Sequence, residues 1–193
     1  MELLQVGDAL IIKHAPINFK IKIEMKKIVL MISLMISGCI YSQIAIGKAS
    51  LESESSSIEF GNANKGIILP WVPDLASVQN AVNGTLVFEL SDKKIKLYRN
   101  NSWADLSIDA TGAADSSLQD ALNDNPAAKM AIGTPTTTPG ILVLEDNDKA
   151  MILPKVASPH LNIISPAAGM MVYDTVKKQL AVFNGSVWTF WGE

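Results

Sequence analysis

The sequence predicts an all-β protein built from two tandem, hairpin-rich β modules, with an N-terminal signal-peptide helix and a short helical linker between the modules. Three observations support this prediction. A block of residues beginning at Lys65 recurs at Lys149. Each block holds short runs of strand-forming residues separated by polar turns. The apolar residues, 48% of the 193, are concentrated in the first 42 positions, as expected for an export segment.

The N-terminal region has the parts of a signal peptide at an internal position. Met25 is followed by two lysines, an apolar run over residues 28–37 and then small residues. The run is shorter than the roughly 20 residues that cross a bilayer. We therefore interpret residues 25–42 as a signal peptide and residues 1–24 as a mis-annotated upstream extension.

Two processing chemistries compete at the end of this segment. Ser37 and Gly38 precede Cys39, the pattern of a lipobox in which Cys39 would be acylated. Cleavage between Ser42 and Gln43 instead fits an ordinary signal peptidase. The first outcome predicts a lipoprotein anchored to the membrane only through Cys39. The second predicts a protein secreted or held at the outer membrane or cell surface, without a cysteine and hence without a disulfide.

Each module is expected to repeat one order of elements. In the first module, residues 43–106, a strand over 66–70 ends at Pro70, and strands over 86–88 and 95–98 form a hairpin followed by a turn and Trp103. The second module, residues 130–193, repeats the strands and the tryptophan at 150–154, 171–173, 180–183 and Trp188. The stretches 74–83 and 157–168 are expected to be irregular, with a short helical turn.

The segment between the modules, residues 107–129, differs in composition. It is rich in Ala, Asp, Ser and Asn, and Leu118 and Leu122 lie four residues apart. Asp115 is placed to cap a short helix that ends before Pro126. We interpret the segment as a linker that is helical or flexible.

Taken together, these motifs resemble those of known secreted proteins. The junction Tyr41-Ser42-Gln43, the Lys-Gly-Ile-Ile-Leu-Pro run at 65–70, and the Phe-Asn-Gly-Ser-Val-Trp run at 183–188 resemble secreted or surface proteins of flavobacteria and other Bacteroidota. The hairpin with its trailing tryptophan also resembles, distantly, the β modules of phage tail fibres. Trp71 and Lys155 depart from the pattern, because the family often has a second proline and an arginine there. The resemblance implies a β-rich fold and a surface location, but no reaction.

Few residues of the sequence are suited to catalysis or to metal binding. His160 is the only histidine after residue 42, and no cysteine occurs after residue 42. This disfavours a catalytic triad and a zinc site. The acidic run 145–148 lacks the ligand spacing of a calcium loop and is interpreted as a solvated turn. We expect no enzyme activity, cofactor or metal. The net charge of −3 without a basic cluster argues against nucleic acid as a partner.

The remaining candidates are aromatic residues and one threonine. Trp103 and Trp188 are expected to cap the core against Tyr98 and Phe183, with sugar stacking as the alternative. The candidate stacking residues are Trp71, Trp103, Trp188 and Trp191. Thr175, in Asp-Thr-Val, resembles an O-glycosylation acceptor of Bacteroidota.

The sequence as a whole predicts a structural or adhesin-like protein without catalytic activity. Self-association through unpaired strand edges is the expected partnership, with surface polysaccharide as the other candidate. A carbohydrate-binding module is one alternative function, and a fibre-like assembly subunit is another.

Overall fold

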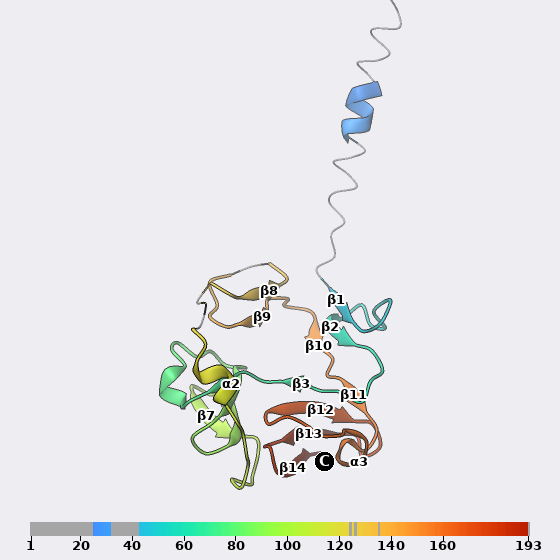
Figure 1. The fold of residues 1–193 in the computed structure, drawn as a ribbon. Helices are drawn as coiled ribbons and strands as arrows, with labels where there is room; N and C mark the ends of the chain where they lie inside the picture. The colour runs from blue at the N-terminus through green and yellow to red at the C-terminus, as the bar shows by residue number, and fades with distance from the viewer. Residues whose placement is uncertain (1–24, 32–42, 124, 126, 135, 193) are drawn as a thin grey trace, which may run out of the picture. The chain divides into compact units, whose positions relative to one another are not determined.

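The computed structural model describes residues 25–31, 43–123, 125, 127–134 and 136–192 (Figure 1). The chain divides into two compact units, Met1–Tyr41 and Ser42–Glu193. In the first unit residues 25–31 are helical, within the predicted signal peptide. None of the helices in the described ranges has the length and apolar content needed to cross a bilayer. Cys39 and Ser42 lie outside the described residues.

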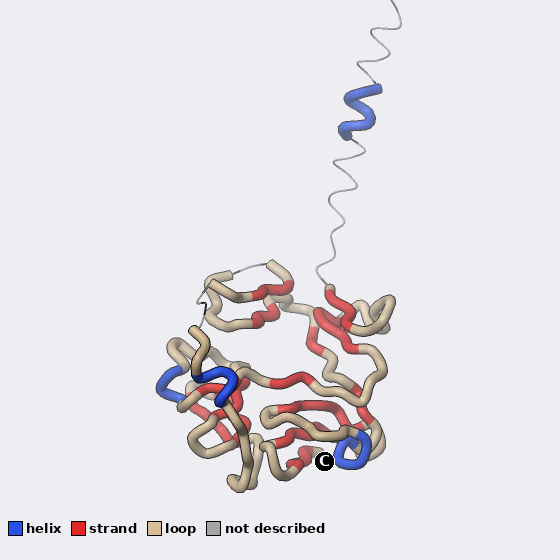
Figure 2. The backbone as a smooth tube through the Cα atoms, viewed as in Figure 1, coloured by secondary structure: helices blue, strands red, loops and turns tan. Residues whose placement is uncertain are grey.

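The second unit confirms the all-β prediction, with short strands in several small sheets (Figure 2). Its helical segments are the 3-10 helix η1 (Leu75–Ser77) and the α-helices α2 (Ser117–Asp120) and α3 (Pro159–Asn162). The strands of the first module are β1 (Ile44–Ile46), β2 (Ser56–Phe60), β3 (Ile67–Ile68), β4 (Trp71–Val72), β5 (Leu86–Glu89), β6 (Lys94–Arg99) and β7 (Ser102–Asp105). Those of the second are β8 (Met130–Ile132), β9 (Leu142–Leu144), β10 (Ala150–Met151), β11 (Lys155–Val156), β12 (Met170–Asp174), β13 (Gln179–Phe183) and β14 (Trp188–Trp191).

The internal repeat is visible in the strand pairing. β1 pairs in parallel with β2, and β8 pairs in parallel with β9. The backbone amide of Gly61 donates to the carbonyl of Ile46 at 2.7 Å, and the amide of Glu145 donates to that of Ile132 at the same distance. Equivalent strands therefore begin each module with the same hydrogen-bonded geometry.

The predicted hairpins are confirmed in both modules. β5 and β6 pair antiparallel and continue into β7, as β12 and β13 continue into β14. In the first module the turn between β6 and β7 is Asn100-Asn101, both with positive φ, which is the conformation that a tight hairpin turn needs. The short helical turns expected within 74–83 and 157–168 are η1 and α3.

The strands expected over 66–70 and 150–154 were predicted too long. Each is interrupted before its proline and resumes after it, so that β3 and β4 belong to different sheets, as do β10 and β11. The prolines lie at the crossing between sheets, where the carbonyl of Pro70 accepts the amide of Phe88 at 2.8 Å. A residue without an N–H group suits this crossing because it interrupts a ladder on one side only.

The two modules exchange strands and share a core. β3 of the first module pairs antiparallel with β12 of the second, and β10 of the second pairs in parallel with β2 of the first (Figure 1). One buried apolar cluster takes residues from both modules, namely Leu69, Phe88, Ile95, Ala168, Met171 and Val182. A second cluster, around Val156, Val172 and Phe183, belongs to the second module. The division at residues 106 and 130 stays a prediction.

The segment after β7 lies against the second module. The side-chain amide of Asn184 donates to the carbonyl of Asp109 at 3.0 Å, and the Ser186 hydroxyl donates to that of Thr111 at 3.0 Å. The helix α2 is shorter than predicted. The Asp115 carboxylate accepts the Ser117 amide at 3.0 Å, but it does so from the position before the N-cap.

Substitution of Gly185 tests this contact. Gly185 and Gly84 have nearly the same positive φ, 99° and 96°, but a Cβ on Gly185 would lie 1.7 Å from the carbonyl oxygen of Ala113, whereas one on Gly84 meets nothing within 4 Å. Both Gly→Ala changes incur the backbone cost of about 1–2 kcal/mol. We expect Gly185→Ala to lower the free energy of unfolding by about 1–3 kcal/mol more than Gly84→Ala.

Urea unfolding at one fixed protein concentration measures this difference. Equal losses for the two variants would show that residue 113 does not pack on the Gly185 turn in solution.

A second test concerns Glu59, a buried residue of β2. Its carboxylate accepts the amides of Glu52 at 2.7 Å and Ser53 at 2.9 Å, and lies 2.8 Å from the Lys48 ammonium. The Glu52 amide and Lys48 lower the pKa of Glu59 from 4.5 to about 2, against the opposing effect of burial. Because the pKa is lower in the folded state, the stabilisation is present above about pH 4.5 and is lost as the pH falls toward 2.

We therefore expect Glu59→Gln to weaken the dependence of Tm on pH between 4.5 and 2, and to lower Tm at pH 7. Glu54→Gln, at an exposed position nearby, is the matched control and should leave the profile unchanged. If the two variants have the same profile, the Glu59 contacts do not stabilise the fold.

Candidate self-association site

The second module leaves part of its sheet structure open. β8 and β9 form a two-stranded sheet, whereas their counterparts β1 and β2 are joined by a third strand, β10. The additional strand changes burial. Ile58 of β2 is 4% exposed, whereas Leu142, its counterpart in β9, is 44% exposed.

Several other large apolar side chains of the second module are exposed. They are Met130, Ile141, Leu161, Ile164, Val176, Val187, Phe190 and Trp191. In the first module Ile68 of β3 is 54% exposed. Sequence reasoning did not single out Ile68, Ile141 or Leu142. The only available signal was that these residues belong to short apolar runs that follow a glycine, Gly66 or Gly140.

Trp103 and Trp188 take the aromatic contacts that their spacing predicts. The ring of Trp103 packs edge-on against Tyr98 with centroids 5.0 Å apart. The ring of Trp188 lies 5.1 Å from Phe183 and 6.4 Å from Phe190. Both indoles are half-buried. These contacts hold β7 and β14 against the hairpins that precede them.

Trp71 and Trp191 serve the junction between the modules. The Trp71 indole N–H donates to the carbonyl of Ala168 at 2.9 Å, and its ring lies 5.9 Å from Phe88. The Trp191 indole N–H donates to the carbonyl of Leu106, while the side chain remains 42% exposed. Both hydrogen bonds connect residues that are more than 80 positions apart in the chain.

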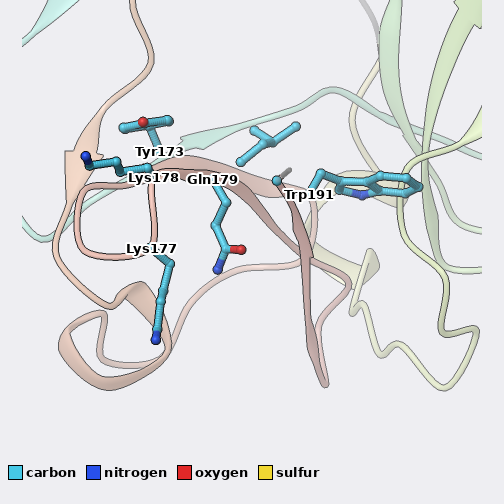
Figure 3. A pocket seen from close by; sticks show the side chains of 7 residues that line it. Tyr173, Lys177, Lys178, Gln179 and Trp191 are labelled. Atoms are coloured by element: carbon cyan, nitrogen blue, oxygen red, sulfur yellow. The ribbon is translucent and has the colours of Figure 1, made fainter.

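Trp191 also borders an open depression on the last sheet (Figure 3). Two lysines from the turn between β12 and β13 and the glutamine that begins β13 line the other part of it. The complete lining is Tyr173, Lys177, Lys178, Gln179, Leu180, Trp191 and Gly192. The four candidate stacking tryptophans are therefore not brought together, because only Trp191 of the four lines this depression.

Asp174 organises the turn that carries Thr175. One carboxylate oxygen accepts the amides of Val176 at 2.9 Å, Ser158 at 3.1 Å and Lys177 at 3.2 Å. Burial raises the pKa of Asp174, but these amides lower it further, so the net shift is downward. Thr175 is exposed beside this anchored turn, and its glycosylation stays a prediction.

The first module holds a charge cluster around the buried Lys96 that sequence reasoning missed. The Lys96 ammonium lies 2.8 Å from Asp105, 3.3 Å from Glu89 and in contact with Asp92. Burial lowers the pKa of Lys96, but the hydrogen bonds to these carboxylates raise it overall. Lys94 forms a further ion pair with Asp105 at 2.7 Å. The alternation of lysines along β6 is the signal that could have indicated this cluster.

His160 and the acidic run take no part in a metal site among the residues described. The described ranges contain no group of three or more His, Cys, Asp or Glu side chains that could hold a metal ion. The exposed His160 ring packs edge-on against Phe190 at 5.8 Å. Asp146 of the acidic run accepts the Ser57 hydroxyl at 2.6 Å, so this side chain belongs to the junction between the modules.

At the predicted processing junction, only Gln43 is described. Its side-chain amide donates to the carbonyls of Glu54 at 2.8 Å and Ser56 at 2.9 Å. Gln43 is thus anchored beside β2 at the start of the second unit.

Comparison with known proteins places one match on the second module. Residues 131–192, about a third of the chain, match a family described as a phage tail like trimerisation region. Searches of curated proteins and of solved structures gave no match to the chain. The match agrees with the distant resemblance to phage tail fibres, whereas the resemblance to Bacteroidota proteins stays a prediction. The second module, from β8 to β14, is therefore similar to a phage tail like trimerisation region.

Proposed function

We propose that this chain is the subunit of a fibre-like structural assembly in which three copies associate. The observation that carries the proposal is the similarity of residues 131–192 to a phage tail like trimerisation region. The matched residues include β9, which has a strand partner on one edge, and Leu142 with its exposed side chain. Association of copies would cover such edges and apolar groups.

The proposed role is structural rather than catalytic. Outside the first 42 residues the sequence offers one imidazole, that of His160, which is exposed and packs on Phe190. Two of the buried charged groups, Lys96 and Glu59, are engaged in ion pairs and backbone hydrogen bonds. Such contacts stabilise a fold, and neither side chain is poised as an acid or base.

The proposal also includes the location of the protein, which is secreted or held at the cell surface. The lysines and apolar run of residues 25–37 support export, with the lipid anchor at Cys39 as the alternative to soluble release. Surface polysaccharide remains the second candidate partner. Trp191 is the tryptophan best placed to meet it, because its ring is partly exposed beside the depression of Figure 3.

Sedimentation equilibrium of the purified protein tests the trimer. We expect a mass three times that of the single chain, unchanged on dilution through the micromolar range. A mass equal to one chain at the highest soluble concentration would contradict the proposal.

Mass spectrometry of the protein recovered from the producing cells tests its processing. We expect no peptide from residues 1–24, and an N-terminus either at Gln43 or at an acylated Cys39. Recovery of peptides from residues 1–24 in the exported protein would refute the upstream-extension hypothesis.

A further inference from the structure

We infer that a second copy of this chain completes two strand pairings left open in a single copy. Strand β3 of one chain pairs in parallel with β9 of its neighbour, and β5 of the same chain pairs antiparallel with β10 of that neighbour. This inference rests on the proposed function, because it names the surfaces through which the copies associate.

The internal repeat supplies the template for this contact. Within one chain, the first module contributes β2 and β3 and the second contributes β10 and β12, giving the pairs β2 with β10 and β3 with β12. In the repeat, β2 corresponds to β9, β3 to β10 and β5 to β12. Replacing each strand of the two pairs by its counterpart in the other module gives β9 with β3 and β10 with β5. Neither pair forms among the described residues of a single chain. Both form when the second module of one chain meets the first module of another.

The directions of the backbone amides agree with this arrangement. The Leu69 amide donates to Gly169 beside β12 at 3.0 Å, and the Ala150 amide donates to Ser55 beside β2 at 2.9 Å. Ala150 corresponds to Gly66, three residues before Leu69. Amides an odd number of residues apart in an extended strand point to opposite edges. The edge that β3 uses to pair with β12 is therefore equivalent to the open edge of β10. In the same way, the edge that β10 uses to pair with β2 is equivalent to the open edge of β3.

The pairing of β10 with β2, whose register shifts between Ala150 and Met151, supplies the register of the parallel pair. In the chain, Met151 of β10 lies opposite Ile58, which is 4% exposed. Their counterparts are Ile67 of β3 and Leu142 of β9. We therefore expect Ile67 of one chain opposite Leu142 of the next. Leu142 is 44% exposed and Ile68 is 54% exposed, so this pairing would remove apolar surface at the open position.

The antiparallel pair follows in the same way. One edge of β12 is covered by β3 at Met170 and Met171 and by β11 at the two residues Tyr173 and Asp174. In β5, the strand β4 covers only Phe88 and Glu89. The preceding part of β5, at Leu86, is open. Leu86 is half-buried, whereas its counterpart Met171 is 3% exposed. We expect Met151 of the neighbour opposite Leu86.

The two pairings involve the same two modules of the neighbouring chains. Both join the second module of one chain to the first module of the next, which makes the contact head-to-tail rather than two-fold. A head-to-tail contact closes into a ring when its rotation permits and otherwise continues as a filament. Three chains per ring is the closure that the proposed trimer requires.

Disulfide trapping between chains tests the register. Ile67→Cys and Leu142→Cys are made in separate full-length chains that also carry Cys39→Ser, since Cys39 is the only natural cysteine. The two chains are co-produced with different affinity tags and oxidised. We expect a disulfide-linked pair containing one chain of each kind, and no linked pair when either variant is produced alone.

A register-shifted partner is the matched control. Leu144→Cys lies two residues further along the same face of β9, which displaces its Cα by about 6.6 Å from the expected partner. A disulfide needs Cα atoms within about 7 Å, so the yield with Ile67→Cys should fall about tenfold. Equal yields for Leu142→Cys and Leu144→Cys would overturn the register.

Sedimentation of the same samples separates this inference from the proposed function. A threefold mass with the mixed disulfide supports both. A threefold mass without it, or with Leu142→Cys chains linked to each other, overturns the strand contact and leaves the trimer standing. A single-chain mass contradicts the proposed function and this inference together.

A charge substitution provides an independent test. Leu142→Lys places an ammonium at a position that is exposed in one chain, so the far-UV circular dichroism should not change, while the mass should fall threefold. Leu161→Lys, on the 73% exposed side chain of α3, is the control and should keep the full mass. A full-mass assembly of Leu142→Lys would overturn the contact.

Discussion

The structure depends on backbone pairing between its two modules. β3 and β10 are two-residue strands, and neither has a strand partner within its own module. Strands of this length have no independent stability in water. They are held because β12 and β2 present edges to them and because Leu69, Phe88 and Met171 pack in one core beneath the junction. The modules are thus two parts of one folding unit, although they derive from one repeated sequence.

Two buried charged residues of the first module have apolar counterparts in the second. Lys96 of β6 pairs with carboxylates from β5, from the turn after it and from β7, and its counterpart in β13 is the buried Ala181. Glu59 lies in β2, and its counterpart in β9 is Val143. A buried charge requires the groups that pair with it, whereas an apolar residue requires only volume. The buried charges of the first module are consequently paired with its own strands and loops, and β9 of the second module is more apolar and more accessible than its counterpart β2.

Local chemistry made much of this fold predictable. The hairpins around Lys93 and Lys178 and the aromatic contacts of Trp103 and Trp188 depend on residues close in sequence, and the repeat provided each of them twice. Pairing between modules was not predictable, because a two-residue strand has no periodicity and its partner lies about 100 positions away. The contact of Gly185 with Ala113 was missed for the same reason. The open edges of the candidate site emerged only when burial at equivalent positions, Ile58 and Leu142, could be compared.

Strand exchange between the modules also affects how the chain folds. Ile67 in β3 pairs with Met171 in β12. The first module therefore cannot complete its structure until β12 is available to pair with β3. Contacts of such long sequence separation slow folding and prolong the exposure of apolar edges. Neighbouring chains that have not yet folded can therefore offer β12 to the same unpaired β3. A cell that produces this protein in quantity must keep unfolded chains apart until β3 of each chain has paired with its own β12.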